Sequence, residues 1–137
     1  MQARRYVAGP GWSPIADLVT GAGQPTPSVA VAVDAAGNAF VTANRFVSGG
    51  SEARLHAARF AASSGTWSVA STLSAPGQWA VLSDVAVDPA GNAVAVWFQS
   101  VGAQITQASR WNAAPAAPAI TGVAPAPQSL AVHVNVA

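Results

Sequence analysis

The chain of 137 residues contains no cysteine, so it can form no disulfide and offers no thiolate for catalysis or metal binding. Charge is scarce as well, because only 8% of the residues are charged, against about 25% in a typical soluble domain. Six basic and five acidic residues leave a formal net charge of +1, and the basic residues cluster only at Arg4 and Arg5. We therefore expect no electrostatic attraction to nucleic acid or to anionic membranes.

Long hydrophobic runs are missing too, although 51% of the residues are hydrophobic. The apolar runs are short and are cut by Gly, Pro, Asn or Asp, whereas a membrane-spanning helix needs about 20 consecutive apolar residues. The N-terminal stretch MQARRYVAGPGW does not read as a signal peptide, because Gly9, Pro10 and Gly11 interrupt any apolar segment after the arginines. If the protein is exported, we expect its signal to lie outside this chain.

Sequence motifs of catalysis and metal binding are also missing. Neither His56 nor His133 has an Asp or Glu at a metal-binding spacing, and there is no G-x-S-x-G, phosphate-loop or H-E-x-x-H motif. Asp34 and Asp88 occupy the same position of a repeat, whereas a catalytic pair of acids needs two different environments. We therefore predict that the chain is not an enzyme and binds no cofactor or metal.

What the sequence does contain is an internal repeat. The stretch VAVDAAGNA (31–39) returns as VAVDPAGNA (85–93), 54 positions later. Shorter matches surround it at spacings of 51 to 55 residues, and self-similarity at this period indicates a repeat architecture. These matches are Arg5-Tyr6, Arg59-Phe60 and Arg110-Trp111; Trp12-Ser13 and Trp67-Ser68; Leu18 and Leu73; and Gly23-Gln24 and Gly77-Gln78.

Each repeat predicts four short antiparallel strands. In the second repeat the first two strands are expected at 83–88 and 93–98. Third strands are expected at 53–61 and 103–111, and a fourth strand at 66–73. Short apolar runs bounded by Gly, Pro, Asn and Ser favour strands over helices, and no sustained helical periodicity competes with them.

The repeated D-x-x-G-N sequence predicts a tight turn between the first two strands of each repeat. The Asp side chain can accept hydrogen bonds from backbone N–H groups of the turn, and the Gly can adopt a positive φ. We expect the same conformation in both turns. The residues concerned are Asp34, Gly37 and Asn38 in the first repeat and Asp88, Gly91 and Asn92 in the second.

The apolar pattern of the strands predicts how they pack. The segment SVAVAVD places Val on one face and Ala on the other, whereas a sheet with one wet face shows polar residues at every second position. Small residues on one face and branched ones on the other suit a sheet packed between two neighbouring sheets, as in a β-propeller blade. We therefore predict an all-β fold of four-stranded antiparallel units of propeller-blade type. About two and a half units fit in the chain, and a β-sandwich with a donated C-terminal strand is the alternative.

Over roughly residues 5–111 the sequence resembles bacterial propeller-like repeat proteins. The resemblance rests on an apolar strand followed by D-x-x-G-N-A, a second strand with Trp97, an Arg-aromatic strand and a GTW hairpin. SSGTWS (63–68) is similar to the Asp-box of sialidase-type propellers. It lacks the aspartate and has a shorter Gly-to-Trp spacing, so sialidase chemistry is not implied.

The composition divides the chain into three parts. Residues 1–111 form the repeat region, with units at about 5–58 and 59–111, and 112–127 are a Pro/Ala-rich linker. Residues 128–137 are expected to form a C-terminal strand, and from Pro118 onward the sequence resembles the opening of a bacterial fibronectin type III domain. We expect 129–136 to pair as an edge strand with a sheet. The apolar face of this assembly strand would be Leu130, Val132, Val134 and Val136.

We expect the chain to be incomplete alone, since a propeller typically needs roughly 4 to 8 blades to close. Fewer units leave apolar faces open at both ends, and few charges are present to cover them. The expected partners are identical copies, other domains of a parent chain and a glycan, with no nucleic acid and no membrane span. Identical copies would form a ring if the contact closes and a filament if it does not.

Trp79 draws attention to a ligand-binding face, because its counterpart in the first repeat is Pro25. We place it in the loop SAPGQWAVLS, among the loops that emerge together on one face of a propeller. Aromatic, amide and charged groups suit the binding of a sugar or a polar peptide. The alternative is that Trp79 covers a hydrophobic edge of its own sheet. The expected ligand residues are Trp79, Gln78, Gln24, Arg45, Glu52 and Gln99.

These features together favour a non-enzymatic binding or scaffolding module of a bacterial surface or secreted protein, with a glycan as the expected ligand. The alternative is a structural subunit that assembles into a ring or filament by strand exchange. Either function predicts an extracellular or cell-surface location.

Overall fold

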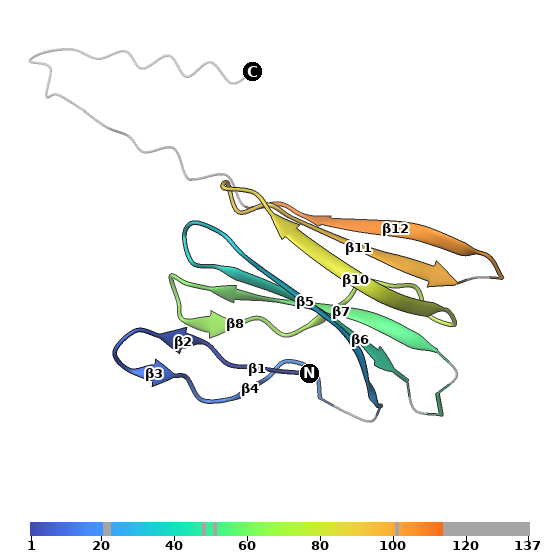
Figure 1. The fold of residues 1–137 in the computed structure, drawn as a ribbon, viewed down its shortest axis with the longest axis horizontal. Coiled ribbons are helices and arrows are strands. Elements are labelled where there is room, and N and C mark those ends of the chain that lie inside the picture. The colour runs from blue at the N-terminus through green and yellow to red at the C-terminus, as the bar shows by residue number, and fades with distance from the viewer. Residues whose placement is uncertain (21–22, 48, 51, 101, 114–137) are drawn as a thin grey trace, which may run out of the picture.

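The structure is a computed structural model that describes residues 1–20, 23–47, 49–50, 52–100 and 102–113. All regular structure in these residues is β-strand, as the sequence predicts, and none of it is helical (Figure 1). Among them, therefore, no helix has the length and apolarity that a bilayer span requires.

Six long strands build most of the fold. They are β5 (Pro25–Val33), β6 (Ala39–Phe46), β7 (Ala53–Ala61), β10 (Trp79–Val87), β11 (Ala93–Ser100) and β12 (Gln104–Trp111). The others are only two residues long. They are β1 (Gln2–Ala3), β2 (Tyr6–Val7), β3 (Gly11–Trp12), β4 (Ala16–Asp17), β8 (Thr66–Trp67) and β9 (Ser71–Thr72).

The long strands form two antiparallel groups. In the first strand group, β5 pairs with β6 and β6 with β7, while β8 and β9 pair with the other edge of β7. In the second strand group, β10 pairs with β11 and β11 with β12. One parallel pair, Trp79 with Ala53, joins the two groups into a sheet of eight strands. No closed barrel or ring of sheets is formed by the described residues.

The two groups are also packed on each other. β10 lies against β5 and β6. Ser83 donates its backbone N–H to Ser28 Oγ at 3.0 Å, and Asn44 Nδ2 donates to the Ala80 carbonyl at 2.6 Å. The small residues of the repeated strands allow this close approach.

Two apolar clusters form the core. One consists of Leu55, Ala80 and Trp97, with Leu73 packed against it, and so lies between the two strand groups. The other consists of Leu18, Val41 and Ala58, and residues of the N-terminal hairpins pack against it. The N-terminal hairpins are the pairs β1–β4 and β2–β3. The first cluster therefore lies between the two strand groups, and the second lies between the N-terminal hairpins and the first strand group.

The two repeated turns have the same conformation. Asp34 donates its N–H to the Asn38 carbonyl at 2.9 Å, and Asp88 donates to the Asn92 carbonyl at 2.9 Å. In each turn the Asp carboxylate accepts from both the backbone and the side-chain nitrogen of the Asn, at 2.7 to 2.9 Å. The Asn side-chain donation is the main cause that lowers the pKa of both Asp carboxyls.

Each turn also binds the segment after the third strand of its group. Asn38 Oδ1 accepts from the Ala62 N–H at 3.0 Å, and Asn92 Oδ1 accepts from the Ala113 N–H at 3.0 Å. The Asn of the motif is therefore a structural bridge between a turn and a strand end, with its amide used on both sides.

Replacing the turn glycines with alanine should distinguish two equivalent positions. Gly37 has φ 81° and Gly91 has φ 83°, so each alanine should cost about 1–2 kcal/mol of backbone strain. An added Cβ at Gly91 would lie 3.2 Å from Asp34 Oδ2, whereas at Gly37 it would meet only Ala62 Cβ at 3.6 Å. We expect Gly91→Ala to be the more destabilising of the two in urea unfolding. Equal losses of unfolding free energy in the two variants would show that the close approach of Gly91 to Asp34 does not affect stability.

Two predictions about the strands need correction. The fourth strand, expected at 66–73, is divided into β8 and β9, and Val69 between them is exposed. Trp79 is not in a loop but begins β10 and pairs with Ser100. The expected boundary between the units, at 58 and 59, falls inside β7, which is also the strand predicted at 53–61.

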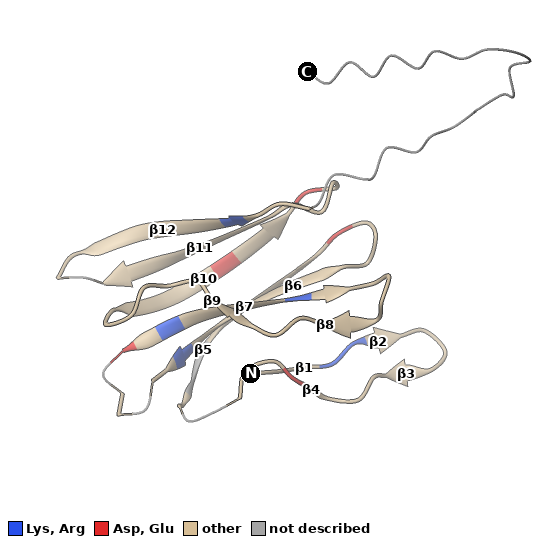
Figure 2. Cartoon of the chain, turned by 180° about the vertical axis from the view of Figure 1, so that it is seen from behind, with Lys and Arg blue, Asp and Glu red and all other residues tan. Residues whose placement is uncertain are grey.

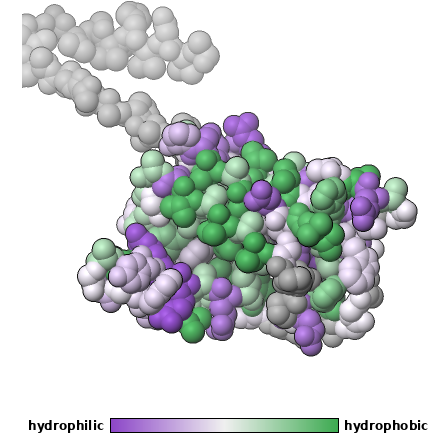
Figure 3. Space-filling model, viewed as in Figure 1, coloured by the Kyte–Doolittle hydropathy of each residue, from purple (hydrophilic) through white to green (hydrophobic). Residues whose placement is uncertain are grey.

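Within the described residues, one face of β5 and one face of β11 are left open, in keeping with the expectation that few units leave apolar faces uncovered. Val29, Val31 and Val33 of β5 remain 61–66% exposed, because β10 packs on the opposite face. Val94, Val96 and Phe98 of β11 are 38–42% exposed, while the alternate residues of that strand are buried. We call these two sets the β5 row and the β11 row. Figure 3 shows apolar side chains gathered across the middle of the face drawn in Figure 1.

Candidate functional site

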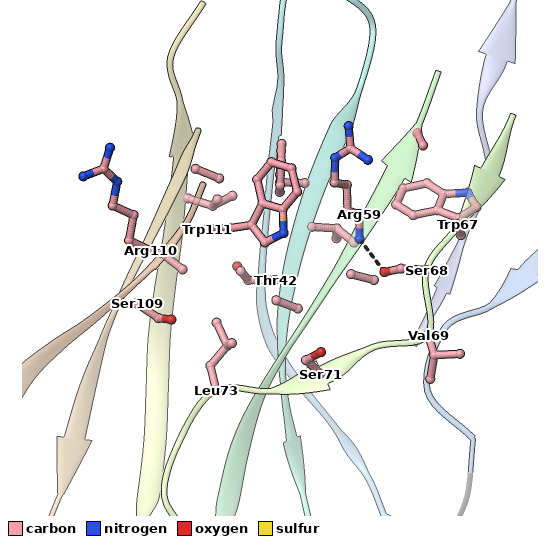
Figure 4. Close-up of a pocket in the computed structure, with 18 of the residues that line it drawn as sticks. Thr42, Arg59, Trp67, Ser68, Val69, Ser71, Leu73, Ser109, Arg110 and Trp111 are labelled. Carbon is pink, nitrogen blue, oxygen red and sulfur yellow. Dashed lines mark hydrogen bonds between the residues drawn. The ribbon is translucent and has the colours of Figure 1, made fainter. Parts of the chain in front are cut away.

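A groove of about 500 Å³ lies where β6 to β9 of the first strand group face β10 to β12 of the second. We call it the central groove (Figure 4). Its lining is mainly apolar, with arginine and hydroxyl groups among the apolar side chains. Its lining includes Arg59, Trp67, Ser71, Ser109, Arg110 and Trp111.

Arg59 and Trp111 form the middle of the central groove. Arg59 comes from β7 and Trp111 ends β12, and the guanidinium carbon lies 4.8 Å from the centre of the indole ring. Figure 4 shows the two side chains next to each other on facing strands. The Trp111 ring also contacts Phe40, with centroids 5.2 Å apart. The side chains of the two strand groups thus meet through one arginine and two aromatic rings.

The rest of the groove offers both an apolar wall and free hydroxyls. Trp67 packs on Phe60, with ring centroids 5.4 Å apart, and forms one side. Ser71 and Ser109 also line the groove, and their hydroxyls have no hydrogen-bond partner among the residues that the structure describes. Ser68 is different, because its hydroxyl accepts the Arg59 backbone N–H at 3.0 Å. Rings beside free hydroxyls suit a ligand that has apolar faces and polar edges.

A second groove of about 650 Å³ separates the N-terminal hairpins from β8 and the segment after it. We call it the N-terminal groove. Arg5 lies over Phe60 at 4.9 Å, and its backbone N–H donates to Ser13 Oγ at 2.9 Å. Arg5, Ser13 and Phe60 are the sequence-repeat equivalents of Arg59, Ser68 and Trp111. The N-terminal groove also contains a carboxylate, Asp17.

Charge is distributed sparsely over the whole surface. Figure 2 shows the charged residues spread over several strands and turns, and Arg45 and Arg54 are register partners on β6 and β7. No carboxylate lines the central groove among the residues described, whereas Arg59 and Arg110 do. Figure 4 shows the Arg110 side chain pointing away from Trp111. Arg59 is therefore the cation that the central groove presents at its centre.

The predicted ligand residues lie elsewhere, at one end of the strands. Trp79 packs edge-on against Phe46, with ring centroids 5.3 Å apart, and the Gln24 carbonyl accepts the Phe46 N–H at 2.8 Å. Arg45 donates to the carbonyls of Gly23 and Thr20 at 3.2 to 3.3 Å. Gln78 follows in the loop before Trp79 and is partly buried. A hollow of about 280 Å³ at this end contains Gln24 and Phe46 but not Trp79.

Two of the predicted ligand residues are inaccessible. Gln99 is fully buried and accepts the Trp97 indole N–H at 2.9 Å. Glu52 is buried, pairs with Arg54 at 2.5 Å and accepts the Gly77 N–H. Their polarity suggested a ligand surface, but their hydrogen bonds serve the fold. This corrects the predicted site at these two positions.

The remaining predicted positions either form turns or lie outside the described residues. The six turn residues form the hydrogen-bonded turns described above and are not at either groove's centre. Residues 114–137, with the assembly strand and most of the linker, lie outside the described residues. Among the described residues, no three His, Asp or Glu side chains lie close enough together to hold a metal ion. His56 contacts Thr72 Oγ1 at 3.2 Å, and its pKa is lowered by burial and by Arg45 and Arg54.

The sequence reasoning missed Arg59 and Trp111 as site residues, although the signal was present. Arg-aromatic pairs recur at Arg5-Tyr6, Arg59-Phe60 and Arg110-Trp111. What the sequence could not show is that the arginine of one pair lies over the aromatic ring of the following pair. That relation holds for Arg5 over Phe60 and for Arg59 over Trp111.

A scan against protein-family models, a search of curated proteins and a search of solved structures each find no match to this chain.

Proposed function

We propose that this chain is a non-enzymatic binding module of a bacterial surface or secreted protein, and that its ligand is a glycan held in the central groove. The observation that supports this most is the arrangement of Trp111, Trp67 and Arg59 around free hydroxyls. Sugar rings present apolar faces that pack on aromatic rings and hydroxyl edges that need polar partners. This site replaces the end-of-strand site that the sequence predicts, because Glu52 and Gln99 there are buried.

A glycan array followed by titration of the best oligosaccharide tests the proposal. Trp111→Ala should weaken binding about tenfold, because it removes a ring contact of the kind worth about 0.5–1.5 kcal/mol beyond its buried area. Trp12→Ala is the matched control. Trp12 is also exposed and has Arg4 over its ring at 5.6 Å, but it lines neither groove. Retained affinity in Trp111→Ala, or equal losses in the two variants, would rule out the central groove.

A second candidate function is assembly, and the two open apolar rows favour it. The β5 row and the β11 row lie on opposite sides of the packed strand groups, so one copy could present either row to the other row of a neighbour. Large exposed apolar patches on monomers usually mark interaction sites. A contact between unlike rows is head-to-tail and gives a ring or a filament.

Light scattering at micromolar concentration tests assembly. We expect a mass above the 13.6 kDa of a single chain. Val31→Lys should return the mass to that of one chain, since it places a charge in the middle of the β5 row. Residues 129–136 stay predicted as a pairing strand, and deletion of 128–137 separates strand exchange from row packing. A wild-type chain of 13.6 kDa at all concentrations would contradict this candidate.

A further inference from the structure

The Arg59 side chain has no hydrogen-bond acceptor in the part of the chain that the structure describes, although two aromatic rings hold it in position. Its guanidinium lies 4.8 Å from the Trp111 ring centre and 5.7 Å from that of Phe40. Its Nε is buried and has no hydrogen-bond partner among the described residues. Most buried side-chain donors in folded proteins do have a partner. Because Nε is covered by the chain itself, an acceptor from outside the chain would meet the two terminal nitrogens of Arg59, which form no hydrogen bond among the described residues.

The ion pairs of the chain do not supply that acceptor. Among the described residues the one ion pair is Arg54 with Glu52. Asp34 is near enough for the Arg59 charge to contribute to its lowered pKa, but its carboxylate is bonded to Asn38 and makes no ion pair with Arg59. The lining of the central groove contains no carboxylate. Arg59 thus places an uncompensated positive charge in the groove.

The position of the ring defines which acceptor fits. A guanidinium that uses its face for an aromatic ring keeps its N–H groups in its own plane, where they match the two oxygens of a carboxylate. The Trp111 ring and the hydroxyls of Ser71 and Ser109 lie in the same groove. A sugar that carries a carboxyl group combines these needs in one ligand.

The N-terminal groove provides an internal comparison. It has the equivalent arginine, Arg5, over the equivalent ring, Phe60. It also contains Asp17, whose carboxylate would repel an anion and whose counterpart in the central groove's repeat is Thr72. The repeat therefore preserves the arginine-ring contact in both grooves, while only the central groove combines it with a lining free of acids.

We infer that the central groove selects a carboxylated glycan, and that Arg59 binds the carboxylate while Trp111 contacts the sugar ring. This inference rests on the proposed glycan-binding function and adds the chemical class of the ligand. It requires no covalent step, only a charged hydrogen-bond pair that forms on binding.

The probes are oligosaccharides that contain glucuronic acid and the same oligosaccharides with each carboxyl reduced to an alcohol. The wild-type chain should bind the acidic form about tenfold to a hundredfold more tightly, the range expected for hydrogen bonds to charged groups. Arg59→Gln should reduce that ratio to about one, and Arg59→Lys should leave an intermediate ratio because it keeps the charge without the planar fork. Since each ratio is taken on a single variant, a general loss of stability does not imitate the effect.

Arg5→Gln is the matched control. It removes one positive charge and one arginine-ring contact in the N-terminal groove, so the ratio should stay at the wild-type value. Circular dichroism confirms that each variant is folded, and the wild-type and Arg59→Lys ratios suffice if Arg59→Gln unfolds.

The possible outcomes separate the inference from the function on which it rests. Equal binding of the acidic and reduced oligosaccharides would overturn the selectivity for carboxylate and leave glycan binding in place. Binding of neither form, with no other glycan bound on the array, would overturn both. Poly-glutamate that binds as tightly as the acidic oligosaccharide, and in competition with it, would show that charge alone is recognised and would also overturn the inference.

Discussion

Trp97→Ala is expected to lower the free energy of unfolding by about 3–5 kcal/mol, the usual cost of truncating a buried aromatic residue. Trp97 is only 4% exposed and forms the cluster between the two strand groups with Leu55 and Ala80. Its indole N–H donates to Gln99 Oε1 at 2.9 Å, and Gln99 is fully buried. The substitution therefore leaves a cavity and also a buried acceptor without its donor. A small domain is stable by about 5–15 kcal/mol in total, so much of the fold's stability would be lost.

Urea unfolding followed by circular dichroism measures this effect. Trp12→Ala is the control, because Trp12 is 62% exposed and its truncation creates no cavity. We expect the control to change the unfolding free energy by less than about 1 kcal/mol, because Trp12 loses only its surface contacts with Tyr6 and Arg4. A cost for Trp97→Ala as small as that of the control would mean that the two strand groups are not held together by this cluster.

Glu52→Ala is expected to cost about 3 kcal/mol, at the low end of the range for breaking a buried ion pair, because the Arg54 side chain keeps 34% exposure to water. The Glu52 carboxylate accepts from Arg54 and from the Gly77 N–H. Its backbone carbonyl accepts the Val47 N–H at 2.9 Å. Glu52 therefore joins the loop between β6 and β7 to the loop before β10, and its removal should loosen both.

Glu52→Gln keeps the side-chain size and one acceptor oxygen, so it should be less destabilising than Glu52→Ala. The unfolding free energy that Glu52→Gln loses, compared with the loss in Glu52→Ala, measures how much of the effect comes from the charge. Glycan affinity of the folded fraction should stay unchanged in both, because Glu52 is buried and does not line the central groove. A loss of affinity without a loss of stability would instead support the predicted role of Glu52 in ligand binding.

The local features of this protein could be predicted from its sequence because they depend on neighbouring residues. The D-x-x-G-N motif contains its own hydrogen-bond partners and the glycine that a positive φ requires, so both turns follow from a few residues each. The all-β class follows in the same way from short apolar runs between turn signals. The start of β11 at Ala93 and the bounds of β7 are also as predicted.

Burial, in contrast, depends on which segment packs where, and a repeat does not determine that. Trp97 and Ala43 are equivalent in the sequence repeat, yet Trp97 is buried between the strand groups and Ala43 is only partly covered. Val31 and Val85 are also equivalent, yet Val31 is exposed and Val85 is half-buried. Equivalent residues differ because each repeat has different neighbours.

The candidate site shows the same division. The sequence by itself determined that Arg-aromatic pairs recur, that acids are few and that no catalytic motif is present. Only the tertiary structure decided that Arg59 lies over Trp111, a ring 52 residues further along the chain. It also decided that Glu52 and Gln99 are buried by packed loops and strands instead of facing a ligand. The physical reason is that a hydrogen-bonded turn depends on a few neighbouring residues. A groove, in contrast, exists only where two groups of strands from distant parts of the chain meet.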